Sequence, residues 1–482
     1  MSIMPRYELL KDADVPALAH ATLSVLEKVG VLCQNADLLD ALEKSGMIVD
    51  RTKEVARFPR ELTEAFVEGL KKEVGEPKAD SPRPFPKVAL PGLGTQVAQF
   101  IYDYREREKR PGNREDFIEL VKLGDVLDDG VVGHCLLLTD VPPNLEPLEA
   151  AMVLAEYAHQ PQGAFAWNIM QIDYLLEMGE ILGIEHWYNW GATCFAHPLR
   201  FDKDVADRFV PRAQAGYGVG LTAMPVAGAT TPVTTAGFIV VSSAELLATW
   251  IAGRAINRKV PLYGSMWGAS MDMKTGATSY CAADGMRHAF AMAEFMRKWT
   301  GVEVHVGGGE YCDAKVPGYF AAWEKAYKAM TIAAFTGRHP NIGEGMLEQG
   351  KTLSPVQLLL ERELRLGVQL YAKHVEVTPQ TIALDTIIDV AFGLDRSYVG
   401  CDHTLDHFRE DTWLPPIMDR SGYAGPEQEE AVLNRLQEKV DELIASYQKP
   451  EVDPDKLAKM RAVVERAQRE LVEGFRGGYK TT

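Results

Sequence analysis

Residues 305–325 read HVGGGEYCDAKVPGYFAAWEK, and this stretch carries the strongest signal for the fold. A short apolar segment ends at Val306 and is followed by three consecutive glycines, then by Glu310, Tyr311 and Cys312. Consecutive glycines suit a backbone that turns sharply or lies close to a ligand. In α/β barrels the reactive groups lie in the loops that follow the C-terminal ends of the strands. The stretch therefore predicts a barrel strand whose following loop contributes to a functional site.

Short apolar runs alternate with longer amphipathic segments from about residue 98 to residue 410. Residues 148–158, 244–256 and 286–299 are helical segments of this kind. The alternation predicts a (β/α)8 TIM barrel, an α/β fold. A doubly wound open sheet is the alternative, which the lack of a GxGxxG motif after the first strand disfavours. The eight candidate strands are residues 131–138, 163–168, 193–198, 219–225, 261–267, 302–307, 340–344 and 397–401.

Both flanks of this region have helical patterns. Apolar spacing predicts helices between residues 10 and 80, and residues 73–96 are rich in proline and glycine, as in a linker or wrapping loop. After residue 424 the chain is charged, with an apolar stripe at Leu433, Leu436, Val440 and Leu443. We expect these C-terminal helices to pack on the barrel or on another subunit; a solvated tail is the alternative. The predicted parts are 1–97 (N-terminal helical segment and linker), 98–424 (barrel catalytic domain) and 425–482 (C-terminal helical extension).

The composition favours a soluble, cytoplasmic enzyme. The 482 residues carry a formal net charge of −17, which argues against nucleic acid or an anionic membrane as the main partner. The six cysteines include no CxxC pair, a reduced intracellular pattern. The first residues lack the design of a signal peptide, and no uninterrupted apolar run reaches the roughly 20 residues of a membrane span.

The predicted strand ends are rich in aromatic residues and poor in basic ones. Aromatic ring faces attract organic cations such as quaternary ammonium groups. Trp167 and Trp267 are the first candidates for such a site, and the alternative is that both are core tryptophans. The residues at these ends are Asp140, Trp167, Asn168, His197, Met224, Pro225, Tyr263, Met266, Trp267, Glu310, Tyr311, Glu344 and His403.

Other catalytic patterns are weak or missing. Zinc ligands could come from Cys401, His403 and His407, or from Cys194 and His197, but this spacing is generic and we assign no metal site. The sequence has no GxSxG, Walker A or HExxH motif. It also lacks the D-x-H-x-x-G motif that supplies a cobalt ligand in cobalamin-binding domains. The threonines at 230, 231 and 234 could cap a helix that begins near residue 236.

Several longer segments together resemble the trimethylamine methyltransferase family, the cobalamin-dependent barrel enzymes that demethylate methylamines and betaines. The resemblance extends over nearly the whole chain. After CDAKVP the chain departs from the family pattern, which implies an altered pocket at Gly318, Phe320, Ala322, Trp323 and Glu324. The segments that carry the resemblance are ATLSVLEKVGVLC (21–33), PVAGATTPVTTAGFIVVSSAELLA (225–248), DMKTGATSY (272–280), GGGEYCDAKVPGYFAAWEKA (307–326) and YVGCDHTLDHFREDTWLPPIMDR (398–420).

Some members of this family carry pyrrolysine, which aligns with or beside residues 308–311. This chain has only standard residues there, which implies the non-pyrrolysine branch and a quaternary amine substrate such as glycine betaine. A quaternary ammonium is already an activated methyl donor, because its tertiary amine product leaves as a neutral molecule without proton delivery. The implied reaction is methyl transfer to the Co(I) form of a corrinoid (cobalamin) carried by a separate partner protein. That protein would bind transiently at the barrel mouth.

The resemblance leads to a set of candidate site residues. A substrate carboxylate could bind His403, His197, Arg338 or the loop amides after Gly307, and Glu310 or Glu344 could balance the ammonium. A lyase or hydrolase with Glu310 or His403 as base, or a non-catalytic betaine-binding protein, are the alternatives. The charged C-terminal helices also predict a homo-oligomer. The catalytic candidates are Glu310, Tyr311 and His403; the substrate-binding candidates are Trp167, Asn168, His197, Tyr263, Trp267, Gly308, Gly309, Arg338 and Glu344.

Overall fold

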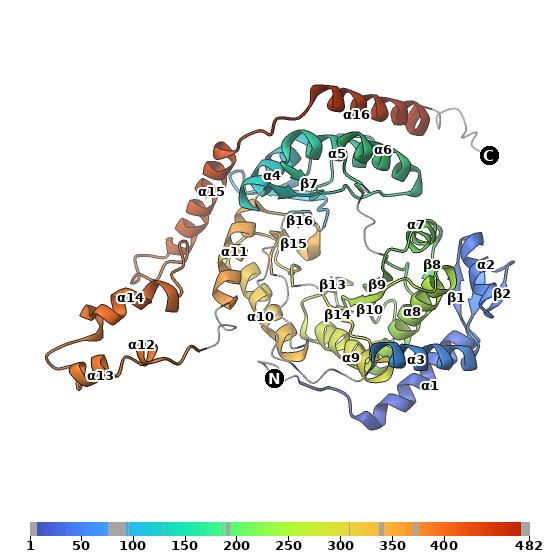
Figure 1. Ribbon diagram of the computed structural model, residues 1–482, viewed down its shortest axis with the longest axis horizontal. Helices are drawn as coiled ribbons and strands as arrows, with labels where there is room; N and C mark the ends of the chain where they lie inside the picture. Colours follow the sequence, from blue (N-terminus) through green and yellow to red (C-terminus); the bar gives the residue numbers. More distant parts are fainter. Residues whose placement is uncertain are drawn as a thin grey trace.

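The computed structural model describes residues 7–75, 93–94, 96–128, 130–185, 187–188, 193–307, 309–336, 342–369 and 375–473. Helices and short strands alternate along the chain, and in Figure 1 the helices α4 to α11 surround the strands. The chain is therefore a mixed α/β protein, as the sequence predicts.

The N-terminal part is a small α/β unit. The helices expected before residue 80 are present, but three short strands lie between them that the sequence analysis did not predict. β1 pairs with β3 in the antiparallel direction and with β8 in the parallel direction, so a strand from the central region completes this sheet. The elements are α1 (Val15–Lys28), β1 (Val31–Cys33), α2 (Ala36–Lys44), β2 (Ile48–Asp50), β3 (Val55–Arg57) and α3 (Arg60–Val74).

The central region repeats the order strand, then helix. Its strands are β4 (Phe100–Asp103), β5 (Glu108–Pro111), β6 (Val131–Val132), β7 (Gln160–Pro161), β8 (Arg200–Phe201), β9 (Val219–Ala223), β10 (Val226–Ala227), β11 (Leu262–Met266), β12 (Ala269–Met271), β13 (Thr278–Ser279), β14 (His305–Val306), β15 (Met346–Leu347) and β16 (Thr352–Leu353). Its helices are α4 (Arg114–Leu127), α5 (Glu146–Tyr157), α6 (Ile172–Leu182), α7 (Lys203–Gln214), α8 (Thr235–Ile256), α9 (Ala283–Thr300), α10 (Tyr319–Thr336) and α11 (Pro355–Gln369).

Parallel hydrogen bonds join these strands in two arcs. In one arc β11 lies between β9 and β14, and the amide of Thr222 extends the arc to the carbonyl of Thr193. In the other arc β16 pairs with β4, the amide of Leu137 bonds to the carbonyl of Ala98, and β6 pairs with β7. Among the described residues the strands form five separate sheets. The strand–helix order is that of the predicted barrel, whereas its closure into a single sheet stays a prediction.

The predicted eighth strand, residues 397–401, is wrong. Residues Tyr398–Gly400 form a single 3₁₀ turn, and Val399 is 80% exposed. This turn belongs to residues 375–424, here called the arm, which carries α12 (Pro379–Ile382), α13 (Leu384–Val390) and α14 (Asp402–Asp411). Figure 1 shows these helices extending away from the ring of helices. β4, which the sequence pattern does not predict, pairs with β16 in the parallel direction.

The C-terminal helices pack on the central region, so the solvated-tail alternative is wrong. α15 (Gln428–Ser446) contacts α4 and α11, and α16 (Pro454–Ala467) contacts α5 and α6. Leu436 and Val440 of the predicted stripe are buried, and Leu433 and Leu443 are partly buried against the same core.

Helix α8 is the one described helix that is long and apolar enough to cross a membrane. However, 78% of its apolar window is buried inside the protein, where it contacts α1, α2, α7 and α9. Its N-terminus is capped by Thr234, whose hydroxyl oxygen accepts a hydrogen bond from the amide of Gly237 at 3.3 Å. These contacts are those of a core helix in a soluble protein.

Candidate functional site

Three aromatic rings from separate loops converge after the ends of β11 and β14. The ring centroids of Trp267 and Tyr311 lie 4.8 Å apart in an edge-to-face arrangement, and those of Tyr280 and Tyr311 lie 5.7 Å apart. The indole N–H of Trp267 donates to the hydroxyl of Ser265 at 2.8 Å, which fixes the indole over the strand. We call Trp267, Tyr280 and Tyr311 the aromatic cluster. It brings together two predicted site residues and one that the prediction did not include.

Glycines allow these rings to approach the backbone. A Cβ atom on Gly307 would lie 2.1 Å from Nε1 of Trp267, and one on Gly350 would lie 2.2 Å from Cε1 of Tyr311. Any side chain at either position would displace a ring. At Gly307 the backbone lies against the Trp267 indole, whereas the close approach of the glycine run to a ligand stays a prediction. Gly309 is buried in the turn that follows, and Gly308 lies outside the described residues.

A small hollow adjoins the aromatic cluster and contains a buried lysine. Trp267, Tyr280 and Gly307 line one part of it, and α9 and α10 contribute Phe290 and Lys328. Only 2% of Lys328 is exposed. Its Nζ lies 3.8 Å from Sγ of Cys281 and 5.9 Å from the centroid of the Tyr311 ring. The hollow thus combines aromatic rings with an ammonium group.

The phenol of Tyr311 and the neighbouring thiol of Cys281 stay protonated near neutral pH. Burial raises the pKa of Tyr311 far above its ordinary value. Burial also raises the pKa of Cys281 to about 11, although nearby Lys328 acts in the opposite direction. A neutral phenol and a neutral thiol are poor bases and poor nucleophiles. The cluster is therefore suited to binding and to water exclusion.

Glu310 lies next to the cluster and is 9% exposed. Its Oε1 accepts a hydrogen bond from the side-chain amide of Gln96 at 3.3 Å. Gln96 comes from the segment that enters β4, so this bond joins the glycine loop to the opposite arc of strands.

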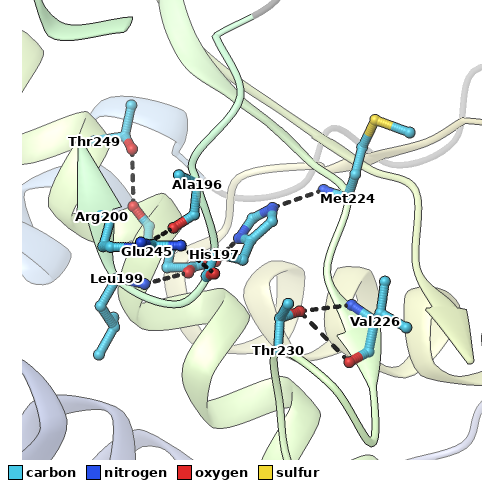
Figure 2. A network of polar contacts seen from close by, with 9 residues as sticks. All are labelled: Ala196, His197, Leu199, Arg200, Met224, Val226, Thr230, Glu245 and Thr249. Carbon is cyan, nitrogen blue, oxygen red and sulfur yellow. Dashed lines mark hydrogen bonds and ion pairs between the residues drawn. The ribbon is translucent and has the colours of Figure 1, made fainter. Parts of the chain in front are cut away.

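His197 belongs to a different network, which Figure 2 shows. Its Nδ1 lies 2.8 Å from a carboxylate oxygen of Glu245, and its Nε2 accepts the backbone N–H of Met224 at 3.1 Å. This second bond requires an unprotonated Nε2, so Nδ1 carries the proton and donates it to Glu245. The other carboxylate oxygen of Glu245 accepts the amide of Leu199 at 2.7 Å. Both ring nitrogens of His197 are thus engaged in holding the loop after Thr193 against α8.

Trp167 and Asn168 lie in a third network. The indole N–H of Trp167 donates to Glu146 at 2.6 Å, and the same carboxylate accepts a bond from the buried His134 at 3.0 Å. Asn168 caps a 3₁₀ turn by accepting the amide of Met170 at 3.0 Å. Among the described contacts, none joins Trp167 or Asn168 to the aromatic cluster.

The remaining predicted residues are scattered. Tyr263 lies on β11, two positions before Ser265, with the guanidinium of Arg212 5.8 Å from its ring centroid. Glu344 is 2% exposed and has a left-handed backbone with φ 71°. His403 does not follow a barrel strand: it lies on α14 of the arm, 4.6 Å from the ring of His407. Arg338 lies outside the described residues.

A metal site has no support in the described part of the chain. No three histidine, cysteine, aspartate or glutamate side chains gather there in a way that could hold an ion.

Comparison with known proteins identifies the family. Residues 1–472 match the family model described as trimethylamine methyltransferase (MTTB). The chain belongs to the trimethylamine methyltransferase family. The predicted resemblance is therefore confirmed, and the chain is a methyltransferase of this family.

Individual relatives are distant but extend over nearly the whole chain. Trimethylamine methyltransferase MttB of Desulfitobacterium hafniense strain DCB-2 is 24% identical over 95% of this chain and 94% of its own. The glycine betaine methyltransferase of Desulfitobacterium hafniense strain Y51 is 24% identical over 98% and 99%, respectively. The solved hydroxylamine complex of MtmB aligns with a TM-score of 0.40 and 11% identity, covering 92% of this chain and 96% of that one.

Two residues of this site were absent from the prediction. Tyr280 ends the segment 272–280, which carries part of the family resemblance, so its sequence signal was available. Lys328 lies in the middle of α10, away from any strand end, and only its burial distinguishes it from an ordinary helical lysine.

Proposed function

We propose that this methyltransferase transfers a methyl group from a quaternary amine, glycine betaine or a related betaine, to the Co(I) corrinoid of a partner protein. The observation that carries the proposal is the aromatic cluster at the glycine loop. Its rings offer electron-rich faces, and the phenol of Tyr311 and the neighbouring thiol of Cys281 carry no charge near neutral pH. Such rings attract quaternary ammonium groups.

The reaction requires little acid–base chemistry from the protein. The carbon–nitrogen bond breaks and its electron pair stays on nitrogen, so the amine leaves as a neutral molecule. Trp267, Tyr280 and Tyr311 would hold the ammonium, exclude water and direct one methyl group outward. Orientation and desolvation of this kind are established sources of rate acceleration. Glu310, held by Gln96, would lie at the edge of this site.

The corrinoid would supply the nucleophile for the methyl carbon. The features of this chain support a corrinoid carried by a partner. His134 and His197, which lie near the strand ends, both bond to carboxylates through a ring nitrogen. The hollow beside the aromatic cluster is small, and a corrin macrocycle is far larger. A transient complex at the loop end of the strands, in the cytoplasm, would bring the two together.

The direct test is methyl transfer to free cobalamin. The protein is incubated with cob(I)alamin and a panel of quaternary amines that includes glycine betaine, carnitine, choline and tetramethylammonium, and the visible spectrum is followed. We expect conversion to methylcobalamin with at least one of these donors. A homologous enzyme that methylates free cobalamin under the same conditions is the positive control. If this protein then gives methylcobalamin with none of the tested donors, the proposal is wrong.

We also propose that the protein is a homo-oligomer. The arm carries many large apolar side chains in water, including Phe392 at 92% and Leu394 at 87% exposure, and among its residues Val390 alone is buried. An exposed apolar surface of this kind marks a contact site. Because every copy of the chain carries the arm, two copies can contact each other through it, and a second copy is the partner that we propose. Sedimentation equilibrium should give a mass that is a multiple of 53.4 kDa, and a monomer would overturn the proposal.

A further inference from the structure

Two lysines lie one turn apart on α10 and have different surroundings. Lys325 is fully buried and forms an ion pair with Glu361, which is also fully buried and accepts the amide of Gly345 at 2.9 Å. Lys328 is 2% exposed, yet no described carboxylate lies within ion-pair distance of its Nζ. The same helix therefore holds one buried ammonium with a counter-ion and one without.

The groups around Lys328 do not neutralise it. Its contact at hydrogen-bond range is Sγ of Cys281, at 3.8 Å, and sulfur is a weak acceptor. The thiol of Cys281 is uncharged near neutral pH and donates to the carbonyl of Tyr311. The Tyr311 ring, 5.9 Å away, offers a weak attraction. A buried ammonium without an anion is strongly disfavoured, so the site lacks a negative group.

We propose that Lys328 binds the carboxylate of the methyl donor, which makes the substrate a zwitterionic betaine. This inference rests on the proposed function. Lys328 lines the same hollow as Trp267 and Tyr280. The rings would bind the trimethylammonium group and Lys328 the carboxylate of the same molecule. Lys328 would form no covalent bond with the substrate.

The other candidate carboxylate ligands are poorer. Both ring nitrogens of His197 are engaged, by Glu245 and by the amide of Met224. His403 lies on α14 of the arm. Lys328 combines burial with a position next to the aromatic cluster.

The test compares two donors that share a quaternary head group and differ in the carboxylate. Methyl transfer from glycine betaine and from tetramethylammonium is measured with the full-length protein and with Lys328→Met, Lys328→Arg and Lys315→Met. We expect Lys328→Met to lower kcat/KM for glycine betaine by about 10- to 100-fold, the range for a hydrogen bond to a charged group, and to leave tetramethylammonium nearly unchanged. Lys328→Arg should restore part of the loss, and the exposed Lys315→Met should have no effect.

Each outcome has one meaning. If the unmodified protein methylates cobalamin from neither donor nor from others of the panel, the proposed function fails. If it is active but Lys328→Met lowers kcat/KM for both donors equally, or for neither, the carboxylate assignment is overturned. Should Lys328→Met fail to fold, inhibition of the unmodified protein tests the assignment instead. N,N-dimethylglycine, which has a carboxylate, should inhibit more strongly than trimethylamine, which has none. Equal inhibition would refute the assignment.

Discussion

Trp167 and Trp267 have the same side chain, but their indole N–H groups donate to different acceptors, and this difference separates their roles. Trp167 donates to the carboxylate of Glu146, so its indole is part of a polar network that also holds His134. Trp267 donates to the small hydroxyl of Ser265 and packs its ring against Tyr311. Both were first candidates for a cation site. Their neighbours favour Trp267 for this role.

We therefore expect Trp267→Leu to raise KM for the quaternary amine by about tenfold, because a desolvated cation–π contact contributes up to about 2 kcal/mol. Steady-state kinetics of methyl transfer measure the effect. Trp167→Leu is the matched control, and its KM should change by less than about twofold. A larger effect at Trp167 would move the cation site to the Glu146 network.

Glu245 offers a second residue-level prediction. Its two carboxylate oxygens accept the Nδ1–H of His197 and the amide of Leu199 (Figure 2). In Glu245→Gln the side-chain NH₂ would face one of these donors, which leaves a buried donor unpaired. We expect a loss of about 1–3 kcal/mol in stability, seen as a lower midpoint of thermal unfolding. The exposed Glu180→Gln should leave the midpoint unchanged, and an unchanged midpoint for Glu245→Gln would contradict the network.

At the scale of elements, the sequence predicts well where local pattern and tertiary contact agree. β9, β11 and β14 and the helices α5, α8 and α9 lie where apolar runs and helical spacing place them. Residues 397–401 have the aromatic and β-branched composition of a strand but no neighbouring strand, and they form an exposed turn instead. The three short strands of the N-terminal unit were missed because each has only three residues.

The same reasoning explains the candidate site. Trp267 and Tyr311 follow strand ends, which the sequence marks. Lys328 reaches the site from a helix, and that no described carboxylate lies within ion-pair distance of it is a property of the folded chain alone. His403 was assigned to the site because it follows the strand that does not form.

The glycine loop gives a prediction at this scale. In Gly307→Ala the new Cβ would overlap the Trp267 indole. Gly307 and Trp267 directly follow the paired residues of β14 and β11, so the backbones are held in place and the ring must move. A displacement of about 1 Å in a binding group can cost about 100-fold in rate, and we expect kcat/KM to fall by that order. Intrinsic tryptophan fluorescence should change as well. Gly69→Ala, on α3 with open space around it, should keep full activity and gain up to about 1 kcal/mol in stability.

For the whole molecule, the arm stands out by its exposure, because Val390 alone among its residues is buried. A segment that exposes its apolar side chains in a single copy gains stability only when another surface covers them. In the proposed homo-oligomer the fold of the ring and the assembly of copies would be linked, because association stabilises the folded form by mass action.

We expect the double substitution Phe392→Ser and Leu394→Ser to shift the protein to smaller species in size-exclusion chromatography with light scattering. The reason is that both side chains are almost fully exposed within one chain and would be covered in an oligomer. Val29→Ser, an exposed apolar residue on the N-terminal unit, is the control and should leave the mass unchanged. An unchanged mass for the arm variant would assign the contact to another surface.

The packing of α8 has a consequence for how the chain is made. α1 and α2 cover part of this long apolar helix, and they are synthesised well before it leaves the ribosome. A preformed N-terminal unit can thus receive α8 as soon as it emerges, before its surface meets other chains. A protein that lacks residues 7–75 would present that surface to water during synthesis. We expect such a chain to aggregate in the cell, even though every residue of the proposed methyl-transfer site is still present.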